Sequence, residues 1–202
     1  YSIEKFLVAR RLMYWQVYLH KTVVSAEVML VEALKRAKAL AVRGEPLFGS
    51  PALQRFLQTQ HTGVDFRNPA VLHDFLRLDD HDIMGAVKVW ALHTDVALRT
   101  LCSSIVERRT FKITLQNAAF DPAMVEQKRA AVAQRLGIPA AQAHHFVLTG
   151  SIINNAYDNS SDGIELLYKD GRVLDIAEAS DNLGIAALSK PVEKWYLAWP
   201  RE

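Results

Sequence analysis

The amino-acid sequence predicts an α+β fold, in which a long N-terminal helix and a helical lobe precede a small antiparallel sheet lobe with flanking helices. Up to about residue 108, apolar residues recur at helical spacing and segments open with helix-start signals. Beyond residue 109, several runs alternate apolar and polar residues, as strands do. Half of the 202 residues are hydrophobic, so a packed core is expected. We therefore expect two lobes, 1–108 and 109–202.

The first of these elements is a long helix, predicted over residues 3–42. Six apolar residues recur at spacings of three, four or seven and define one apolar face: Phe6, Met13, Val17, Val24, Val28 and Val31. Gly44 and Pro46 end the helix. A helix of this length spans about 60 Å, which is more than a lobe of this size can bury. We expect a second domain or subunit to cover part of it.

Shorter helices follow, and each has a recognisable start. Ser50-Pro51 and Asn68-Pro69 each combine an N-cap residue with proline at the first helical position. Asp79-Asp80 precedes an apolar stripe and favours the positive end of a helix dipole. Thr94-Asp95 opens another helix, which runs to Arg108-Arg109. The first lobe is thus expected to be entirely helical.

The second lobe mixes strands with one clear helix. The helix begins at Asp121-Pro122 and ends at Gly137. A hairpin is predicted to turn at Asp170-Gly171, because Asp-Gly favours the tight turns that join antiparallel strands. Residues 154–163 form a polar, turn-rich loop. The predicted strands are 111–115, 146–149, 164–167, 172–176 and 195–199.

Composition excludes several classes of protein. The 24 Lys and Arg residues nearly balance the 22 Asp and Glu residues, so charge gives no reason to expect nucleic acid or an anionic membrane as partner. No apolar run approaches the roughly 20 residues of a membrane span, and no signal peptide is recognisable. Cys102 is the single cysteine, which excludes an internal disulfide and fits a cytoplasmic protein. The apolar periodicity of a helix starts directly after Tyr1, the first residue, so we expect the chain to be part of a longer protein.

Two His-Asp dipeptides are candidate metal ligands. His73-Asp74 and His81-Asp82 follow His61, and a histidine with a His-Asp pair and a further Asp can hold a divalent ion. The spacing is tight for ligands on separate helices, however, and the aspartates are better explained as acids in the first turn of a helix. We expect no metal ion in this chain. The alternative is a self-contained metal hydrolase that uses His61, His73, Asp74 and Asp82.

Other reactive residue types lack the context of an active site. His144-His145 and His93 have no cysteine or carboxylate at ligand spacing, and we interpret them as surface or capping histidines. Cys102 and the neighbouring serines lie in no nucleophile motif, and the sequence has no glycine-rich phosphate loop. We therefore assign no catalytic residue to this chain.

The long helix carries a group of residues suited to an anion. With successive residues 100° apart, Arg10, Tyr14, Tyr18 and Lys21 fall within roughly 80° of arc. Two cations and two phenols on one stripe can hold a phosphate, because arginine binds it as a fork and lysine as a point charge. His20 is expected on the apolar side of the stripe. The alternative is a packing or interface face, where arginine and aromatic residues are also enriched.

The same helix resembles one segment of the HD-domain dNTP triphosphohydrolases. In that family the segment follows the last catalytic aspartate and has the pattern Arg-x-x-x-Tyr-x-x-x-Tyr-x-His-Lys, which residues 10–21 match. Weaker likenesses occur at 27–30, at 75–83 (the family's Leu-x-Asp-Asp-x-x-Ile), at 108–112 (its Arg-x-Leu-Phe-Lys) and at 150–157. Together they extend over essentially the whole chain.

The resemblance implies a C-terminal, non-catalytic region of a cytoplasmic, metal-dependent enzyme that hydrolyses nucleoside triphosphates. It implies no cofactor in this chain, since the HD motif and its divalent metal belong to a preceding domain, which would be a partner of this region. It also implies a homo-oligomer in which Arg10, with Tyr14 and Lys21 beside it, contacts a regulatory nucleotide or anion. The family uses no metal ligand at the position of His81-Asp82. A protein-interaction module without nucleotide remains the other alternative.

Overall fold

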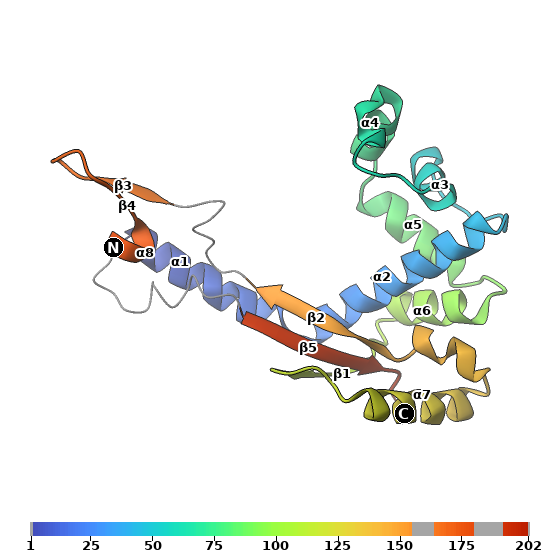
Figure 1. Cartoon of the computed structure of the whole chain (residues 1–202). Helices are drawn as coiled ribbons and strands as arrows, with labels where there is room; N and C mark the ends of the chain where they lie inside the picture. The colour runs from blue at the N-terminus through green and yellow to red at the C-terminus, as the bar shows by residue number, and fades with distance from the viewer. Residues whose placement is uncertain (1, 155–163, 180–191, 202) are drawn as a thin grey trace. The chain divides into compact units, whose positions relative to one another are not determined.

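A computed structural model describes residues 2–154, 164–179 and 192–201 of the chain. It confirms the predicted α+β class, with helices and small antiparallel sheets (Figure 1). The loop expected at 154–163 lies outside the described residues except for Asn154. None of the described helices is long and apolar enough to cross a membrane.

The chain forms two compact units, which we describe separately. The first comprises Tyr1–Val24, Ile113–Val125 and Thr149–Leu197. The second comprises Ser25–Lys112, Glu126–Leu148 and Ala198–Glu202. Each unit draws segments from both sides of residue 108. The predicted lobes, 1–108 and 109–202, were defined as regions that fold independently. The two compact units do not test this, so the two lobes stay a prediction.

The first unit contains two N-terminal helical segments, the larger sheet, and a hairpin followed by a short helix. The N-terminal segments are α1 (Ser2–Met13) and the π-helical η1 (Tyr14–Tyr18). The larger sheet has the strand order β1-β5-β2, formed by Lys112–Gln116, Val192–Trp199 and Leu148–Asn154. Gly150 on β2 allows the close approach of Tyr196 on β5, because a Cβ at Gly150 would lie 2.7 Å from the Tyr196 hydroxyl.

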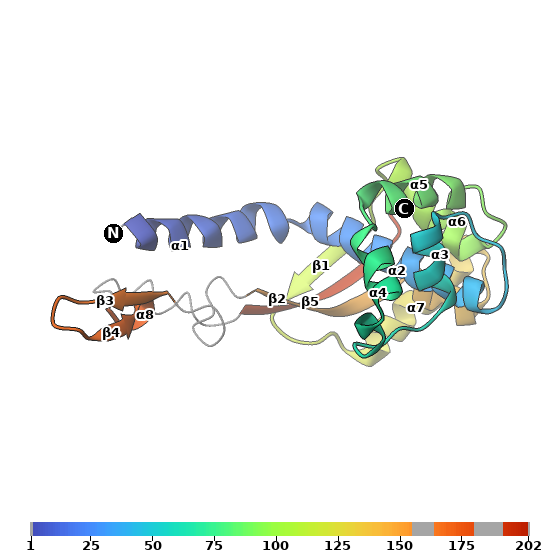
Figure 2. The same ribbon diagram turned by 90° about the horizontal axis from the view of Figure 1, so that it is seen from above.

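The hairpin confirms the turn predicted at Asp170-Gly171. Strand β3 (Glu165–Leu167) pairs antiparallel with β4 (Val173–Asp175), with Leu166 opposite Leu174. Gly171 has φ +85°, the left-handed conformation that glycine adopts without strain. Helix α8 (Ile176–Ala179) follows β4 and lies beside the hairpin (Figure 2). Leu7 is the buried residue of α1. It forms a cluster with Ile176, and Ile164 and Leu166 pack against this cluster.

The prediction of one continuous helix over residues 3–42 is wrong, because the structure interrupts the helix at Leu19-His20. The Leu19 N–H donates to Tyr14 O at 2.7 Å, the i to i+5 pattern of a π turn, and His20 N–H reaches only Val17 O at 3.2 Å. A new helix, α2 (Lys21–Val42), then begins. His20 caps it, since its Nδ1 accepts from the Thr22 N–H. The predicted apolar face is not buried throughout, since Val24 is buried whereas Met13 and Val17 before the interruption and Val31 after it are exposed.

The second unit is built around α2. It contains α3 (Pro51–Gln58), η2 (Asp65–Arg67), α4 (Pro69–Leu76), α5 (Asp80–Trp90), α6 (Val96–Val106), most of α7 (Pro122–Leu136) and η3 (Ala140–His145). The caps predicted at Ser50 and Asn68 are confirmed, and Asp79 and Asp95, predicted only to lie at helix starts, also accept a backbone N–H there. The buried face of α2 carries Met29, Ala33, Ala37 and Leu40, and further core residues are Trp90, Leu98, Leu101 and Phe146.

Candidate functional site

A polar stripe runs along the inner face of α2 in the second unit. Ser25, Met29, Glu32 and Arg36 are spaced by four, three and four residues, so they lie on one face of the helix. Ser25 and Met29 are fully buried, and Glu32 and Arg36 are half-buried. Ser25 and Met29 contact Phe111, whereas Glu32 and Arg36 contact two other parts of the unit. We call this set the α2 stripe.

The first two residues of the α2 stripe hold the backbone of Phe111, just before β1. The Ser25 hydroxyl donates to Phe111 O at 2.8 Å, and the Phe111 N–H contacts Met29 Sδ at 3.3 Å. Both backbone groups of a buried residue are therefore satisfied by side chains from a helix 82 and 86 positions away. This contact fixes where the first strand starts.

Arg36, at the other end of the α2 stripe, forms an ion pair with Asp95. Arg36 Nε lies 3.1 Å from Asp95 Oδ1, and Nη2 lies 2.6 Å from Oδ2, the two-point geometry that suits a guanidinium. Burial alone would raise the pKa of Asp95, but hydrogen bonds from Arg36 and from the Leu98 amide outweigh it, so this pKa is lowered. The hydrogen bond to Asp95 likewise raises the pKa of Arg36. Asp95 thus joins α2 to the start of α6.

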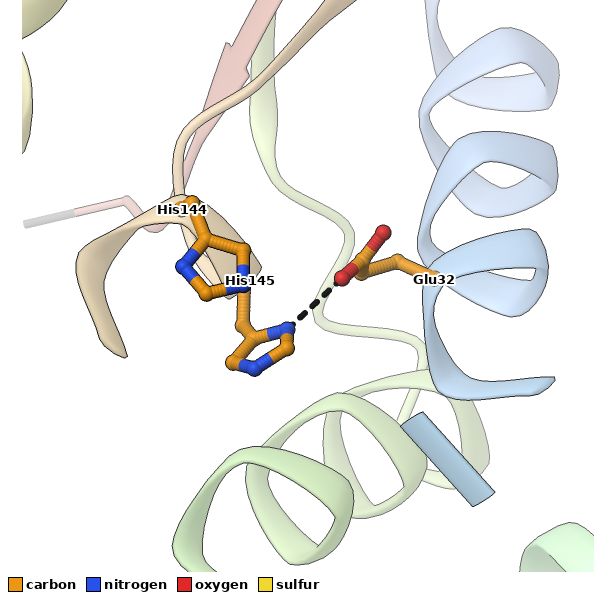
Figure 3. A group of neighbouring side chains, drawn as sticks. All are labelled: Glu32, His144 and His145. Carbon is orange, nitrogen blue, oxygen red and sulfur yellow. Dashed lines mark hydrogen bonds and ion pairs between the residues drawn. The ribbon is translucent and has the colours of Figure 1, made fainter. Parts of the chain in front are cut away.

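Glu32 lies between these contacts and meets two histidines of η3. Its Oε1 lies 2.7 Å from His145 Nδ1, and the two side chains are 16% and 11% exposed. The ring of His144 lies against that of His145, with centroids 3.9 Å apart, and His144 Nδ1 donates to Ala141 O at 2.7 Å. One possible ligand atom from each of Glu32, His144 and His145 lies within 4.8 Å of the other two (Figure 3). A carboxylate with two imidazoles can form a charged hydrogen bond or hold a metal ion.

This group was not predicted from the sequence. His144 and His145 were expected to be surface or capping histidines because no carboxylate stands near them in the sequence. That interpretation is wrong for His145, which is buried against a glutamate 113 positions away. The available signal was weak: a pair of adjacent histidines shortly before a strand, and a glutamate on the inner face of a long helix. His93 does act as a capping residue, since its Nδ1 accepts from the Asp95 N–H at 3.0 Å.

The His-Asp dipeptides have structural contacts instead of shared ligands. Asp74 pairs with Arg55 at 2.5 Å, and Asp82 completes the capping box of α5 by accepting from the Asp79 N–H. The His61 ring packs against Phe56 and Phe66, while His73 and His81 are exposed. Across residues 2–154, 164–179 and 192–201, Glu32, His144 and His145 are the one group of three such residues at ligand distance. The structure therefore does not assemble the alternative hydrolase site.

The aromatic stripe predicted on the first helix is formed in part. The Arg10 guanidinium lies 5.8 Å from the centre of the Tyr14 ring, and the rings of Tyr14 and Tyr18 are 5.1 Å apart. These three residues and Phe6, Ala9 and Met13 line a hollow of about 460 Å³ on one face of α1 and η1. Lys21 is exposed at the start of α2 and is not among the lining residues. The π turn accounts for this, because it shifts the phase of every residue that follows.

Comparison with known proteins relates the whole chain to a phosphohydrolase. A crystal structure of a phosphohydrolase from Bacteroides thetaiotaomicron VPI-5482 matches all of this chain with a TM-score of 0.85 and 48% sequence identity. All 202 residues of this chain are thus similar to part of a phosphohydrolase. The chain spans 50% of the length of that protein.

A second similarity covers part of the chain. Over 112 residues, 55% of this chain, it is 31% identical to the uncharacterized protein YwfO of Bacillus subtilis strain 168, and the matched segment covers 24% of YwfO. No family model matches. The chain thus corresponds to a portion of each longer relative.

Proposed function

We propose that this chain is a non-catalytic region of a metal-dependent phosphohydrolase of the HD superfamily that acts on nucleoside triphosphates. The observation that carries the proposal is the 48% identity to a phosphohydrolase over the full length of the chain. The narrower assignment to HD enzymes of nucleoside triphosphates rests on the pattern at residues 10–21, which resembles the helix after their last catalytic aspartate. The catalytic metal ligands would then lie outside these 202 residues.

The positions of the histidines support a non-catalytic role. Hydrolysis of a phosphate ester by an HD-type enzyme needs a metal ion to activate water and to neutralise the phosphates. Among the described residues, the His-Asp dipeptides are held apart and Asp74 and Asp82 are engaged by Arg55 and by the start of α5. His61, His73, Asp74 and Asp82 therefore do not form a group that could hold a metal ion.

The surface of α1 and η1 supports a contact with nucleotide. Arg10 supplies a positive charge, the Tyr14 and Tyr18 hydroxyls supply hydrogen-bond donors, and Phe6 and Met13 supply apolar surface. A nucleotide presents both a negatively charged phosphate chain and a flat apolar base, so it could use both parts of this hollow. We propose that Arg10 and Tyr14 contact a regulatory nucleotide or a related anion. Lys21 belongs to this proposal only as a nearby charge, since it does not line the hollow.

The same surface supports self-association. Phe6 and Met13, seven residues apart and hence on one face of α1, are 60% and 47% exposed, whereas Leu7 is buried. Apolar side chains gathered on one helix face are typical of an interface between chains. We propose that a second copy of the chain covers this face, so that Arg10 lies beside the contact between subunits. A pure protein-interaction module is the second candidate, and the exposed apolar face favours it equally.

Binding of dGTP to the purified chain, measured by calorimetry without added metal, separates these two functions. We expect Arg10→Ala to weaken binding roughly 10- to 150-fold, because a hydrogen bond to a charged group contributes about 1.5–3 kcal/mol. Arg43→Ala is the matched control, since Arg43 is an exposed arginine just after α2. If the wild-type chain binds no dGTP, or if Arg10→Ala binds as tightly as Arg43→Ala, the nucleotide proposal is wrong and the interaction module is favoured.

A further inference from the structure

We propose that Glu32, His144 and His145 form a binding site for a divalent transition-metal ion that joins η3 to α2. All three residues belong to the second unit, so the geometry of the site is set within one compact body. The sequence supplies two imidazoles and one carboxylate and no thiolate. Such a set suits Zn²⁺, Fe²⁺, Ni²⁺ or Cu²⁺ better than Mg²⁺ or Ca²⁺, which prefer oxygen ligands alone.

The distances fit an ion after a small adjustment. With metal–ligand bonds of about 2.0–2.2 Å, the ligand atoms of a tetrahedral zinc site lie about 3.3–3.5 Å apart. One ligand atom from each residue already lies within 4.8 Å of the other two. Glu32 Oε1 and His145 Nδ1 are 2.7 Å apart and would separate by less than 1 Å to admit the ion. Figure 3 shows the three side chains converging from α2 and η3.

The surroundings of His144 resemble those of a metal ligand. Its Nδ1–H donates to Ala141 O at 2.7 Å, which fixes the neutral tautomer with the proton on Nδ1 and leaves the Nε2 lone pair free to coordinate. Histidines that bind metals generally donate their other ring N–H to a carbonyl or carboxylate in this way. His145 would coordinate through Nδ1, with its ring proton on Nε2.

Charge and access also favour an ion. The Arg36 guanidinium, one turn along α2, makes its two hydrogen bonds to Asp95, so the Glu32 carboxylate faces His145 and can supply negative charge to an ion. Glu32 and His145 are shielded, whereas His144 is exposed to solvent. An ion can therefore enter at His144, and water can fill the remaining positions of its coordination shell. The alternative is a hydrogen-bonded Glu-His pair that binds no metal.

Calorimetric titration of the chelator-treated full chain with Zn²⁺ tests this proposal. We expect one Zn²⁺ per chain at this site, and an affinity at least tenfold lower in His144→Ala, since even partners outside the coordination shell contribute about 10–100-fold. His144 is exposed, so its removal should leave the fold intact. His81→Ala is the matched control, because His81 is an exposed histidine beside aspartates.

Two outcomes would overturn the metal site: no Zn²⁺ binding to the wild-type chain, or equal losses in His144→Ala and His81→Ala. If His144→Ala fails to fold, Glu32→Gln replaces it, since that change removes the charge and keeps the shape of the side chain. Absorption of bound Co²⁺ provides a second readout, with an intensity that should fall in either variant. These measurements use no nucleotide, so their result is independent of the dGTP binding experiment.

Discussion

The Arg36–Asp95 ion pair offers a quantitative test of how α2 is joined to α6. Replacing Asp95 with asparagine removes the charge but keeps an oxygen that can cap α6, since asparagine is as good an N-cap as aspartate. Replacing it with alanine removes both the charge and the cap. The two variants therefore separate two contributions that one side chain makes to the free energy of unfolding.

The expected magnitudes follow from burial and geometry. The Arg36 and Asp95 side chains are 14% and 15% exposed and make two hydrogen bonds. Hydrogen bonds to charged groups contribute about 1.5–3 kcal/mol, so we expect Asp95→Asn to lower the free energy of unfolding by about 2 kcal/mol. Loss of an N-cap costs about 1 kcal/mol, so Asp95→Ala should lower it by about 3 kcal/mol.

Urea denaturation at pH 7, followed by circular dichroism, measures both values. Asp121 provides a matched control, because its side chain accepts the Ala123 N–H at the start of α7 and is exposed. Asp121→Asn should be nearly neutral, and Asp121→Ala should cost about 1 kcal/mol. If Asp95→Asn is as mild as Asp121→Asn, the ion pair contributes no stability and the reasoning is wrong.

Acid titration adds an independent check on the same pair. The pKa of Asp95 is lowered in the folded chain, so its contribution to stability is fully present above the unfolded pKa of about 3.9. That contribution is lost as the pH falls from there through the folded pKa. The wild-type chain should therefore lose more stability than Asp95→Asn between neutral pH and strong acid. Equal losses would contradict the lowered pKa.

Three further predictions concern other parts of the chain. Light scattering should show a dimer or larger oligomer, which should dissociate in the double variant Phe6→Asp plus Met13→Asp. Leu92→Asp, at another exposed apolar position, is the control and should leave the oligomer intact. A monomer at about 100 µM would contradict the proposed interface. Burial raises the pKa of the Cys102 thiol to about 12, so it should react with a thiol reagent at pH 8 only after denaturation, and rapid labelling of the folded chain would contradict its burial. Gly150→Ala should lower the free energy of unfolding through a clash with Tyr196, whereas Gly85→Ala, where an added Cβ meets no atom within 4 Å, should not.

Elements with local signals could be predicted from the sequence. Ser50-Pro51, Asn68-Pro69 and Asp95 begin helices because each side chain accepts a backbone N–H within three residues. The hairpin at Asp170-Gly171 is equally local, since glycine adopts the required positive φ. These features depend on neighbours in the chain and on little else.

Features that depend on distant partners could not be predicted. The π turn at Tyr14–Tyr18 contains no proline or glycine, so no residue type announces it, yet it moves Lys21 off the stripe that holds Arg10. Val31 was placed on the same apolar face as Val24 and is exposed, although both residues lie in α2. Glu32 and His145 are 113 positions apart, and only the packing of η3 against α2 brings them together.

The release of inorganic triphosphate from dNTPs tests the central claim most directly. The proposal predicts that the longer protein containing this chain releases triphosphate when a divalent metal is added, and that the 202-residue chain alone releases none with Mg²⁺, Mn²⁺ or Co²⁺. Triphosphate release by the isolated chain that is lost in Asp82→Ala, but kept in the matched surface variant Asp80→Ala, would contradict a non-catalytic role. Absence of release from the longer protein would contradict the assignment to enzymes of nucleoside triphosphates.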